Sequence, residues 1–451
     1  MEIILPGYVN CILERLHENN YEGFIVGGSV RDLLLGKEPA DYDITTNATP
    51  DEIEEVFKEY KTVNVGKRFG TIIVICNGNK VEITTYRIEG EYLDGRRPSH
   101  VRFSKNIRED LSRRDFTINA MAYNRRTGLV DPFSGKADLK KGIIRTVGKP
   151  KERFEEDYLR VLRAVRFSAQ LQFIIEENTY NACKEQGKLL SYISVERIRE
   201  ELFKILLSEK PSYGINLIKD LGILEVTIPE LVVAVGFDQL NPHHDKNVFD
   251  HIMCVVDNTP PVLITRLAAL FHDIGKPHTL TIDEKGIGYF YGHDKAGAEI
   301  ARGILTRLKC SNEIINTVST LIEEHMSHHA NMKSKGLKRQ ISRVGKEEIF
   351  NLMDLQKADR SCSSENVDIS FLFDRERKIK EILENGEPYQ KNQLKIHGND
   401  IIDLGFERGK LIGEILDYLM EKVIADPSLN DFYRLREIVL KRFGSKKDSE
   451  Q

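Results

Sequence analysis

The chain lacks several features that would place it in a specialised class of protein. No two of its six cysteines, at positions 11, 76, 183, 254, 310 and 362, form a CxxC pair. This scatter argues against a zinc ribbon or a disulfide framework and predicts free thiols in a reducing compartment. No apolar run approaches the ~20 residues of a membrane helix, and the first ten residues lack the layout of a secretory signal. We therefore expect a cytoplasmic protein without a membrane partner.

A strong charge of one sign is also absent. The 451 residues carry a formal net charge of −4, with 40% hydrophobic and 30% charged residues. These values are typical of a soluble globular protein that is long enough for three or more compact units. Net charge says little about RNA binding, which depends on local patches. Residues 87–114 and 145–166 are locally basic, and they lie beside the motifs described below.

The order of apolar patterns predicts an α+β fold, with a small mixed sheet and helices at the N-terminus and helical regions after it. A helix near 7–19 precedes the strand YEGFIVGG, the strand ADYDITT and the helix DEIEEVFKEY. TIIVICNG and KVEITTYR predict a hairpin across NGN, because a turn signal separates two β-branched runs. From about residue 150 onward, apolar residues recur at helical spacing.

The paired glycines Gly27 and Gly28, at the end of the first strand, are the first chemical signal. Glycines let backbone N–H groups approach a phosphate, and a helix beginning at Ser29 would direct its positive end there. Arg31 can add charge-assisted hydrogen bonds to the same anion. A plain tight turn explains two glycines equally well, so this signal depends on its neighbours.

Asp41 and Asp43 lie two residues apart on the predicted strand DYDITT, so their carboxylates project from one face. Two carboxylates on the apolar side of a strand are costly to bury unless a cation lies between them. Phosphoryl transfer uses this arrangement, with two Mg²⁺ that activate a 3′-hydroxyl and neutralise a triphosphate. Glu82 can supply a third carboxylate from a neighbouring strand. An exposed strand with two solvated acids is the alternative.

The segment LSRRDFTINAMAYN combines arginines with polar residues. Arg113 and Arg114 suit phosphate or sugar binding. Asp115 and Asn119 are four residues apart and would share one face of a helix.

The segment EEDYLRVLRAVRFSAQL predicts a helix with Asp157, Arg160 and Arg163 on one stripe, and with Glu156 four residues before Arg160. An Asp accepts from exocyclic amino groups, and an Arg donates to ring nitrogens and carbonyl oxygens, so together they can read a base edge. A salt-bridged helix face is the alternative.

In this order, GGSVRDLLLG, DYDITT, RRDFTINAMAYN, DPFSGKADLKKG and EEDYLRVLRAVRFSAQL resemble the class II tRNA nucleotidyltransferase and bacterial poly(A) polymerase family. The resemblance implies a nucleotidyltransferase head followed by helical neck, body and tail regions. It implies that Asp41 and Asp43 bind Mg²⁺ and are catalytic, and we expect Glu82, from its place on the neighbouring strand, to complete the catalytic set. The residues expected to bind the nucleotide are Gly27, Gly28, Arg31, Arg113, Arg114, Asp115, Asn119, Asp157, Arg160, Arg163 and Arg166.

The segment EGEYLDGRRPSHVRF between Arg87 and Arg113 is basic and contains Gly and Pro, which predicts a mobile loop. In CCA-adding members of the family, a flexible loop at this place is needed to pass from C to A incorporation. The resemblance therefore favours addition of CCA to the 3′ end of tRNA from CTP and ATP. Poly(A) addition, and addition of CC or A alone, stay open as alternatives.

Residues 243–360 are unusually rich in histidine. A His-Asp doublet in the apolar helix LAALFHDIGK needs a polar partner, and a metal ion is an economical one. The order resembles the HD phosphohydrolase superfamily, with His251, His272, Asp273 and Asp359 at its H…HD…D positions. This resemblance implies a divalent transition metal or Mg²⁺, and hydrolysis of a phosphate ester.

Three further residues extend this resemblance. Lys276 fits the HDIGK wording, and His293 and His325 are candidates for a supporting role or for a second metal. A relic HD fold that only builds the body of the protein is the alternative.

We accordingly expect four domains: a nucleotidyltransferase head over 1–145, a helical neck that reads the nucleotide and binds RNA over 146–228, an HD-type metal-binding body over 229–385 and a helical tail over 386–451. Two further functions compete with nucleotidyl transfer: a metal-dependent phosphohydrolase with an RNA-binding head, and a non-catalytic RNA-binding protein. The intact motifs favour the transferase. We expect tRNA, ATP and CTP as partners, with the RNA bound through backbone and shape, and no DNA; the oligomeric state stays open.

Overall fold

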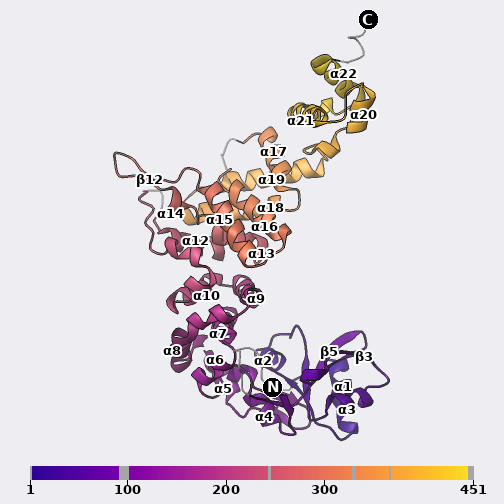
Figure 1. Cartoon of the computed structure of the whole chain (residues 1–451), viewed down its shortest axis with the longest axis vertical. Coiled ribbons are helices and arrows are strands. Elements are labelled where there is room, and N and C mark those ends of the chain that lie inside the picture. Colours follow the sequence, from indigo (N-terminus) through magenta and orange to yellow (C-terminus); the bar gives the residue numbers. More distant parts are fainter. Residues whose placement is uncertain (1–2, 91–100, 242–244, 328–331, 365–366, 445–451) are drawn as a thin grey trace. The chain divides into compact units, whose positions relative to one another are not determined.

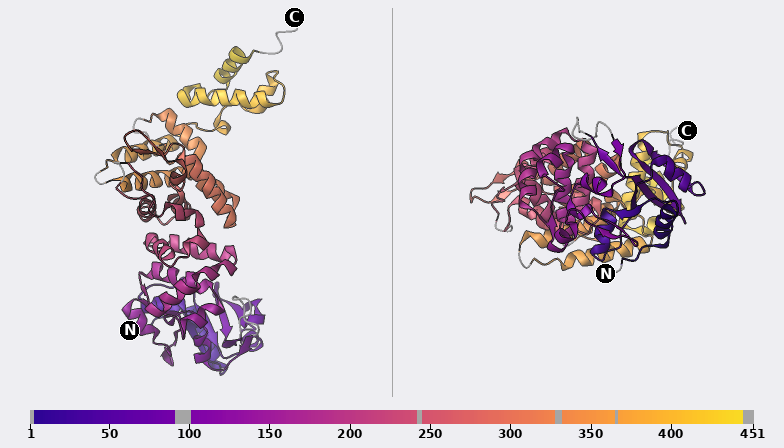
Figure 2. Two further views of the ribbon diagram at one scale, coloured as in Figure 1. Left: turned by 60° about the vertical axis from the view of Figure 1, so that its left-hand side comes forward. Right: turned by 90° about the horizontal axis from the view of Figure 1, so that it is seen from below.

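The computed structural model describes residues 3–90, 101–241, 245–327, 332–364 and 367–444. The chain divides into two compact units, Met1–Pro229 and Glu230–Gln451 (Figures 1 and 2). The predicted α+β class is confirmed, because the sheet lies in the first unit and helices dominate the rest. Most of the loop predicted at 89–103, and the polar tail from 445, lie outside the described residues. The finer division into four domains stays a prediction.

A seven-stranded mixed sheet forms the centre of the first unit. Its order is β3-β4-β5-β2-β1-β8-β9, and β2 with β5 is its parallel pair. This pair matters for function, because its register sets Asp43 level with Glu82. The strands are β1 (Gly23–Val26), β2 (Asp43–Thr46), β3 (Lys61–Gly66), β4 (Thr71–Cys76), β5 (Asn79–Thr85), β8 (Ala122–Asn124) and β9 (Gly128–Val130).

The predicted hairpin across NGN is confirmed as the antiparallel pair β4–β5. Asn77 and Gly78 both have positive φ, 50° and 80°, as a two-residue type I′ turn requires. Helices α1 (Gly7–Glu18) and α3 (Pro50–Val56) pack against the sheet. The capping box between Thr49 and Glu52 starts α3, because it satisfies backbone N–H groups that a helix start leaves open.

The rest of the first unit is mainly helical, and its helix α7 is buried over most of its length. Two short strand pairs accompany it, β6 (Arg87–Glu89) with β7 (Val101–Phe103) and β10 (Ile143–Ile144) with β11 (Ile174–Ile175). The helices are α2 (Gly28–Leu34), α4 (Ile107–Ser112), α5 (Gly135–Lys141), α6 (Pro150–Glu156), α7 (Leu159–Leu171), α8 (Glu177–Gln186), α9 (Val195–Leu206), α10 (Pro211–Asp220) and α11 (Leu224–Thr227).

The single helix predicted over EEDYLRVLRAVRFSAQL is wrong, since it is divided at Asp157. That residue has extended backbone, with φ −154° and ψ 104°. Its Oδ1 accepts a hydrogen bond from the backbone N–H of Leu159 at 3.2 Å, and this bond competes with helix continuation.

The second unit is a helical assembly, and Figure 1 shows α12 to α19 gathered in one bundle. The segment LIGEILDYLMEKVI lies within helix α21, and buried residues between Leu394 and Val439 form a hydrophobic core. Its elements are α12 (Val248–Asp257), α13 (Leu263–Phe271), α14 (Lys276–Thr279), β12 (Thr281–Ile282), β13 (Gly288–Tyr289), α15 (His293–Arg307), α16 (Asn312–Glu324), α17 (Ser334–Val344), α18 (Ile349–Ser363), α19 (Ser370–Glu384), α20 (Gly398–Asp403), α21 (Lys410–Ala425) and α22 (Phe432–Phe443).

Within the described ranges, no helix is both long and apolar enough to span a membrane. The expectation that all cysteines are free is wrong for one pair. Cys254 on α12 and Cys362 on α18 form a disulfide across 108 positions of sequence. The other four cysteines are free. The pairing could not be inferred from spacing, because it depends on α12 packing against α18.

The disulfide predicts a measurable stabilisation of the second unit. Replacing Cys254 and Cys362 together by Ser should lower the free energy of unfolding by about 2–5 kcal/mol, because the unfolded chain regains the entropy of a long loop. Urea unfolding without reductant measures the loss, and Cys310→Ser, at a partly exposed cysteine outside the disulfide, is the control. Adding dithiothreitol should lower the free energy of unfolding of wild type to that of the double variant. If the difference between the two proteins persists unchanged, packing and not the cross-link is responsible.

Candidate functional sites

Three carboxylates lie on one accessible face of the sheet in the first unit. Asp43 is the first residue of β2, and Asp41 lies just before the strand instead of within it. Along this segment Tyr42 and Ile44 are buried, whereas Asp41 and Asp43 are exposed. The two acids therefore share a face as predicted, but it is the exposed face and not the apolar one. Glu82, level with Asp43 on β5, is exposed on the same side.

Mutual repulsion among these carboxylates makes them a candidate cation site. The pKa of Asp43 is raised to about 6 by loss of hydration and by the charges of Asp41 and Glu82, while Arg114 opposes the shift. The rise occurs although the side chain is exposed, because the surrounding groups displace part of its water. A divalent cation would relieve the repulsion, and oxygen ligands suit Mg²⁺. The donor set thus fits the ion, while the assignment of Mg²⁺ to Asp41 and Asp43 stays a prediction.

The glycine turn lies directly against an arginine. Gly27 has φ +78°, and a Cβ there would come 2.9 Å from Nη1 of Arg114. The positive φ favours glycine here, and a larger residue would also have to displace the Arg114 guanidinium. Helix α2 begins at Gly28, one residue earlier than expected. Gly28 and Arg114 together offer N–H groups and positive charge beside the carboxylates, an arrangement that suits a triphosphate.

A buried acid that the sequence did not single out positions the two predicted arginines. Asp110 is fully buried and accepts from Nε and Nη2 of Arg113 at 3.0 and 2.9 Å. Nη2 of Arg114 lies 3.6 Å from its other oxygen. Burial alone would raise the pKa of Asp110, but the two guanidinium groups hold it below its usual value. Nothing in its local sequence distinguishes this residue from a surface acid in a helix.

Asp115 joins the glycine turn to helix α7. Its Oδ1 accepts from Nδ2 of Asn119 at 3.1 Å, and its Oδ2 accepts from Nε and Nη2 of Arg163 at 2.8 and 2.5 Å. Asn119 in turn accepts from Nη1 of Arg31 at 2.8 Å. Burial would raise the pKa of Asp115, but Arg163 and Asn119 outweigh it and keep the carboxylate ionised. The expected helical face over Asp115–Asn119 is wrong, because a 3₁₀ turn at Thr117–Asn119 brings these side chains together.

The predicted base-reading residues line one cavity of about 240 Å³ in the first unit. Both oxygens of Asp157 accept from Arg197 on α9, at 3.1 and 2.7 Å. Arg197 was missed because it lies in an ordinary amphipathic helix, and only tertiary packing brings it here. Arg160 forms an ion pair with Glu156 as predicted. The lining consists of Arg113, Arg114, Asp115, Asp157, Arg160, Arg163 and Arg197.

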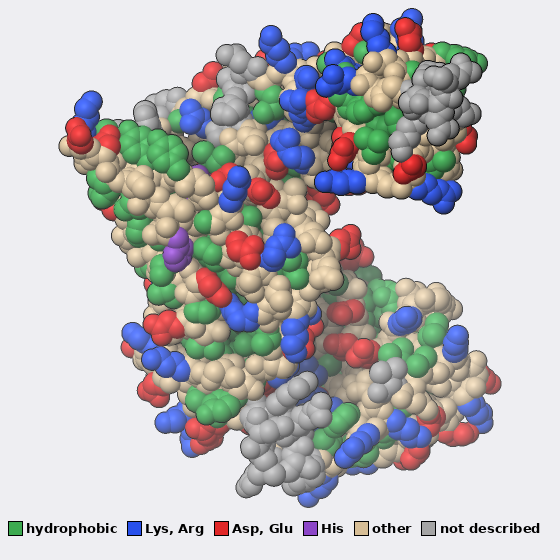
Figure 3. Space-filling view, turned by 45° about the horizontal axis from the view of Figure 1, so that its top comes forward, with side chains coloured by type: hydrophobic (Ala, Val, Ile, Leu, Met, Phe, Trp, Pro, Cys, Tyr) green, Lys and Arg blue, Asp and Glu red, His purple; other side chains and the backbone are tan. Residues whose placement is uncertain are grey.

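Arg166 lies outside this cavity. Its Nε is 3.0 Å from a carboxylate oxygen of Glu201, and its guanidinium stacks over the Phe167 ring at 4.0 Å. Burial lowers its pKa to about 10. Arg166 therefore supports the packing of α7 and α9. On the molecular face in Figure 3, basic and acidic side chains are interspersed.

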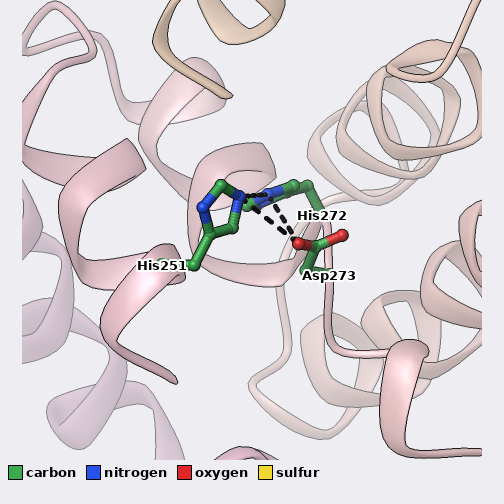
Figure 4. A group of neighbouring side chains, drawn as sticks. All are labelled: His251, His272 and Asp273. Atoms are coloured by element: carbon green, nitrogen blue, oxygen red, sulfur yellow. Dashed lines mark hydrogen bonds and ion pairs between the residues drawn. The ribbon is translucent and has the colours of Figure 1, made fainter. Parts of the chain in front are cut away.

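The four predicted HD residues converge in the second unit. The sequence predicted the His272-Asp273 doublet inside a helix, but it lies at the end of α13. Figure 4 shows His251, His272 and Asp273 pointing toward one another. Nε2 of His251 is 3.0 Å from Oδ1 of Asp359, and Nε2 of His272 is 3.3 Å from Oδ2 of Asp273. The two Nε2 atoms are themselves 3.3 Å apart. His251, His272 and Asp273 have the spacing of a group that could hold a metal ion.

His293 and His325 extend the cluster on the other side of Asp273. Their Nε2 atoms lie 3.4 and 3.9 Å from its Oδ1, and Asp273, His293 and His325 form a second group with metal-binding spacing. Burial lowers the pKa of His325 to about 4, with a contribution from His272. A neutral imidazole is the form that binds metal.

The backbone sets the tautomer of these imidazoles. Nδ1 of His272, His293 and His325 donates to the carbonyls of Ala269, Phe290 and Ile322 at 2.8, 2.6 and 2.5 Å. A carbonyl can only accept, so Nδ1 carries a proton in each of these rings, and in a neutral ring Nε2 has the lone pair. Burial would lower the pKa of His272, but Asp273 outweighs burial and raises it, so a positive charge is favoured beside these carboxylates. The cluster therefore fits a divalent metal ion, whose identity stays a prediction.

Three segments match known families of domains. Residues 23–145 match the Poly A polymerase head domain, residues 172–234 match the Probable RNA and SrmB-binding site of polymerase A, and residues 244–363 match the HD domain. The fold and the two sites thus define a polymerase-type nucleotidyltransferase head in one chain with an HD domain.

Related proteins narrow this class. The CCA-adding enzyme of Oceanobacillus iheyensis is 35% identical over 436 residues, which are 95% of this chain and 96% of the relative. That of Ligilactobacillus salivarius is 49% identical over 205 residues, 46% of this chain, and the chain spans only 50% of that relative's length. The Bacillus stearothermophilus CCA-adding enzyme in complex with CTP has a TM-score of 0.74 at 25% identity, and the match covers 99% of this chain and 100% of that one. The chain belongs to the family of CCA-adding enzymes.

The raised pKa of Asp43 predicts how stability responds to pH. Its folded value of about 6 lies above the ordinary 3.8, so ionisation costs more in the folded than in the unfolded chain. Asp43→Asn should therefore raise the Tm. The increase should grow as the pH rises from 3.8 to about 6 and should stay constant above that range. Calorimetry in EDTA at pH 4 and pH 7.5 tests this prediction. Glu18→Gln, at an exposed residue of α1, is the charge control. Equal shifts at both pH values would contradict the pKa.

Proposed function

We propose that this chain adds CCA to the 3′ end of tRNA from CTP and ATP, without a nucleic-acid template. The observation that carries the proposal is the accessible face on which Asp41, Asp43 and Glu82 meet, next to the glycine turn. The name of the O. iheyensis relative supports the reaction, and the CTP complex of the B. stearothermophilus enzyme supports the nucleotide. Poly(A), CC-only and A-only addition are less favoured.

In this proposal the acidic residues bind the metal ion, and the basic residues and backbone N–H groups bind the phosphates. Asp41 and Asp43 would hold Mg²⁺, which when bound activates the attacking hydroxyl and neutralises the triphosphate. Arg114 and the N–H groups after Gly27 bind the phosphates and stabilise the pyrophosphate that leaves. The RNA 3′-oxygen forms a bond to the α-phosphorus, the bond to the β-phosphate oxygen breaks, and the hydroxyl proton is lost to solvent.

The cavity lined by Asp157, Arg160 and Arg163 can recognise both cytosine and adenine. Cytosine and adenine each present an exocyclic amino group beside a ring nitrogen that accepts. Asp157 can accept from the amino group, and Arg160 or Arg163 can donate to the ring. The bidentate contact from Arg197 holds the Asp157 carboxylate in a defined orientation.

The expected setting follows from these partners. tRNA, ATP and CTP meet in the cytoplasm, and four of the cysteines are free thiols. The tRNA acceptor end is proposed to bind through its backbone and shape, with no DNA partner.

The imidazole–carboxylate cluster favours a second activity, metal-dependent hydrolysis of a phosphate ester. His251, His272, Asp273 and Asp359 would hold the ion, with His293 and His325 beside it. When bound, a divalent cation supplies Lewis-acid activation of water and phosphate. Water adds to phosphorus, the ester P–O bond breaks and the alcohol leaves with a proton.

Sequencing of 3′ ends tests the first activity. Purified protein incubated with tRNA lacking CCA, Mg²⁺, CTP and ATP should give ends reading CCA. Asp43→Ala should abolish extension, because the metal loses a ligand, whereas His272→Ala should leave it intact; Glu18→Gln is the surface control. Ends reading CC, A or a long A tract would refute CCA addition in favour of the corresponding alternative, and no extension would refute nucleotidyl transfer.

Metal content tests the second site. After reconstitution with Mn²⁺, Ni²⁺ or Mg²⁺ and gel filtration, elemental analysis of wild type should find bound metal. His272→Ala should lose most of it, since the Nε2 donor at the centre is removed. His278→Ala, an exposed histidine on α14, should retain it. Metal retained to the same extent in His272→Ala would exclude this site.

A further inference from the structure

A cavity of about 260 Å³ opens beside the imidazole–carboxylate cluster of the second unit. Asp273, His293 and Asp359 form part of its wall. The remaining wall contains three consecutive aromatic residues, Tyr289, Phe290 and Tyr291, which the predicted metal site does not use. A substrate held at the cluster would therefore extend along these rings.

Tyr289 and Tyr291 stack on one another, and we call this stacked pair the platform. Tyr289 and Tyr291 are nearly parallel, with an interplanar angle of 4° and ring centroids 5.8 Å apart. Tyr291 is 76% exposed, so its face is open to a ligand. One exposed tyrosine is ordinary on a protein surface. A parallel pair beside a phosphohydrolase-type cluster is the geometry on which nucleobases stack.

Backbone hydrogen bonds at Gly288 and Phe290 fix the segment that carries the platform. At Gly288 the backbone N–H donates to the carbonyl of Leu240 at 2.8 Å, and its carbonyl accepts from Nδ2 of Asn241 at 3.0 Å. A Cβ at Gly288 would lie 2.5 Å from the carbonyl oxygen of Gln239, so only glycine permits this contact. Between the two tyrosines, the backbone carbonyl of Phe290 accepts from Nδ1 of His293. The aromatic run is thus tied to a candidate metal ligand at short range.

One cation of the cavity remains available for a phosphate. Lys276 is engaged, with Nζ 2.7 Å from both Oδ2 of Asp273 and Oε1 of Gln239. Arg360 is exposed, follows Asp359 on α18 and lines the cavity. Among the residues that the structure describes, no carboxylate forms an ion pair with it. Its planar guanidinium can therefore bind phosphate oxygens.

We infer that this cavity binds a nucleoside phosphate, with the base stacked on Tyr291 and the phosphate between the metal cluster and Arg360. The inference rests on the phosphohydrolase proposed above and names its substrate class. Tyr291 then acts as a specificity-determining residue: it selects esters that carry a planar aromatic base over esters of the same charge that do not.

The absence of tryptophan from the chain gives a direct binding test. Tyr291→Trp introduces a single fluorophore at the platform, and Tyr433→Trp introduces one at a tyrosine of similar exposure, 74%, on α22. In EDTA, adenosine 3′-monophosphate should quench the first and not the second, because stacking acts only on a ring in contact. Glycerol 2-phosphate should quench neither. A local reporter also separates this subsite from nucleotide bound in the first unit.

Hydrolysis gives the second readout. With metal-loaded protein, Tyr291→Ala should lower the ratio of kcat/KM for adenosine 3′-monophosphate over glycerol 2-phosphate by about tenfold, in line with the loss of one stacked base. Tyr291→Phe should keep the ratio, since it keeps the ring, and Tyr433→Ala should not change it. Arg360→Met should reduce kcat/KM for both esters, because both carry the phosphate.

The outcomes distinguish the two proposals. If Tyr291→Trp is not quenched, or if Tyr291→Ala affects both esters equally, the base subsite is refuted while hydrolysis stands. If quenching occurs but loaded wild type hydrolyses neither ester, the phosphohydrolase is refuted and the nucleotide-binding subsite is supported.

Discussion

Asp115 carries a buried, ionised carboxylate, and the candidate transferase site depends on how that charge is satisfied. Arg163 on α7 supplies two hydrogen bonds, Asn119 supplies one, and the backbone N–H of Phe116 supplies another at 2.8 Å. A buried acid cannot lose such partners cheaply, because desolvation of an unpaired charge is far more costly than any single contact is favourable. The same carboxylate therefore contacts α7 directly, and through Asn119 and Arg31 it is connected to the glycine turn. The glycine turn and the cavity lined by Asp157 and Arg163 are linked by the hydrogen bonds of this one charge.

Asp273 has the corresponding position in the second unit. Lys276, His251, His272, His293 and His325 all approach its two oxygens. Burial would raise its pKa, but these neighbours hold it well below the usual value. Backbone carbonyls orient the imidazoles, so the main chain and not the side chains alone decides which nitrogen faces the acid. The disulfide between Cys254 and Cys362 joins α12 and α18, the helices that bring His251 and Asp359 to this centre.

Local pattern was a good guide where a local rule decides the structure. The turn at Asn77-Gly78 follows from the positive φ that both residues tolerate, and α3 follows from its capping box. The order of motifs from the glycine pair to Arg163 indicated the family, and relatives confirm it. Local pattern failed where a side chain competes with the helix, as at Asp157, and where a turn replaces a helical face, as between Asp115 and Asn119. It also missed Asp110 and Arg197, because their importance comes from partners distant in sequence.

By itself the sequence determined the α+β class, the hairpin and the family, and it named the acids, arginines and histidines that are candidates for the chemistry. These are consequences of residue type, spacing and order, which are properties of the chain before it folds. The tertiary structure alone decided that Asp43 lies level with Glu82, that Arg197 holds Asp157, that Cys254 pairs with Cys362 and that Tyr289 and Tyr291 lie beside the imidazole–carboxylate cluster. Each of these depends on strand register or helix packing between distant segments, and no local rule specifies such contacts, because many registers and packings are compatible with the same short-range pattern.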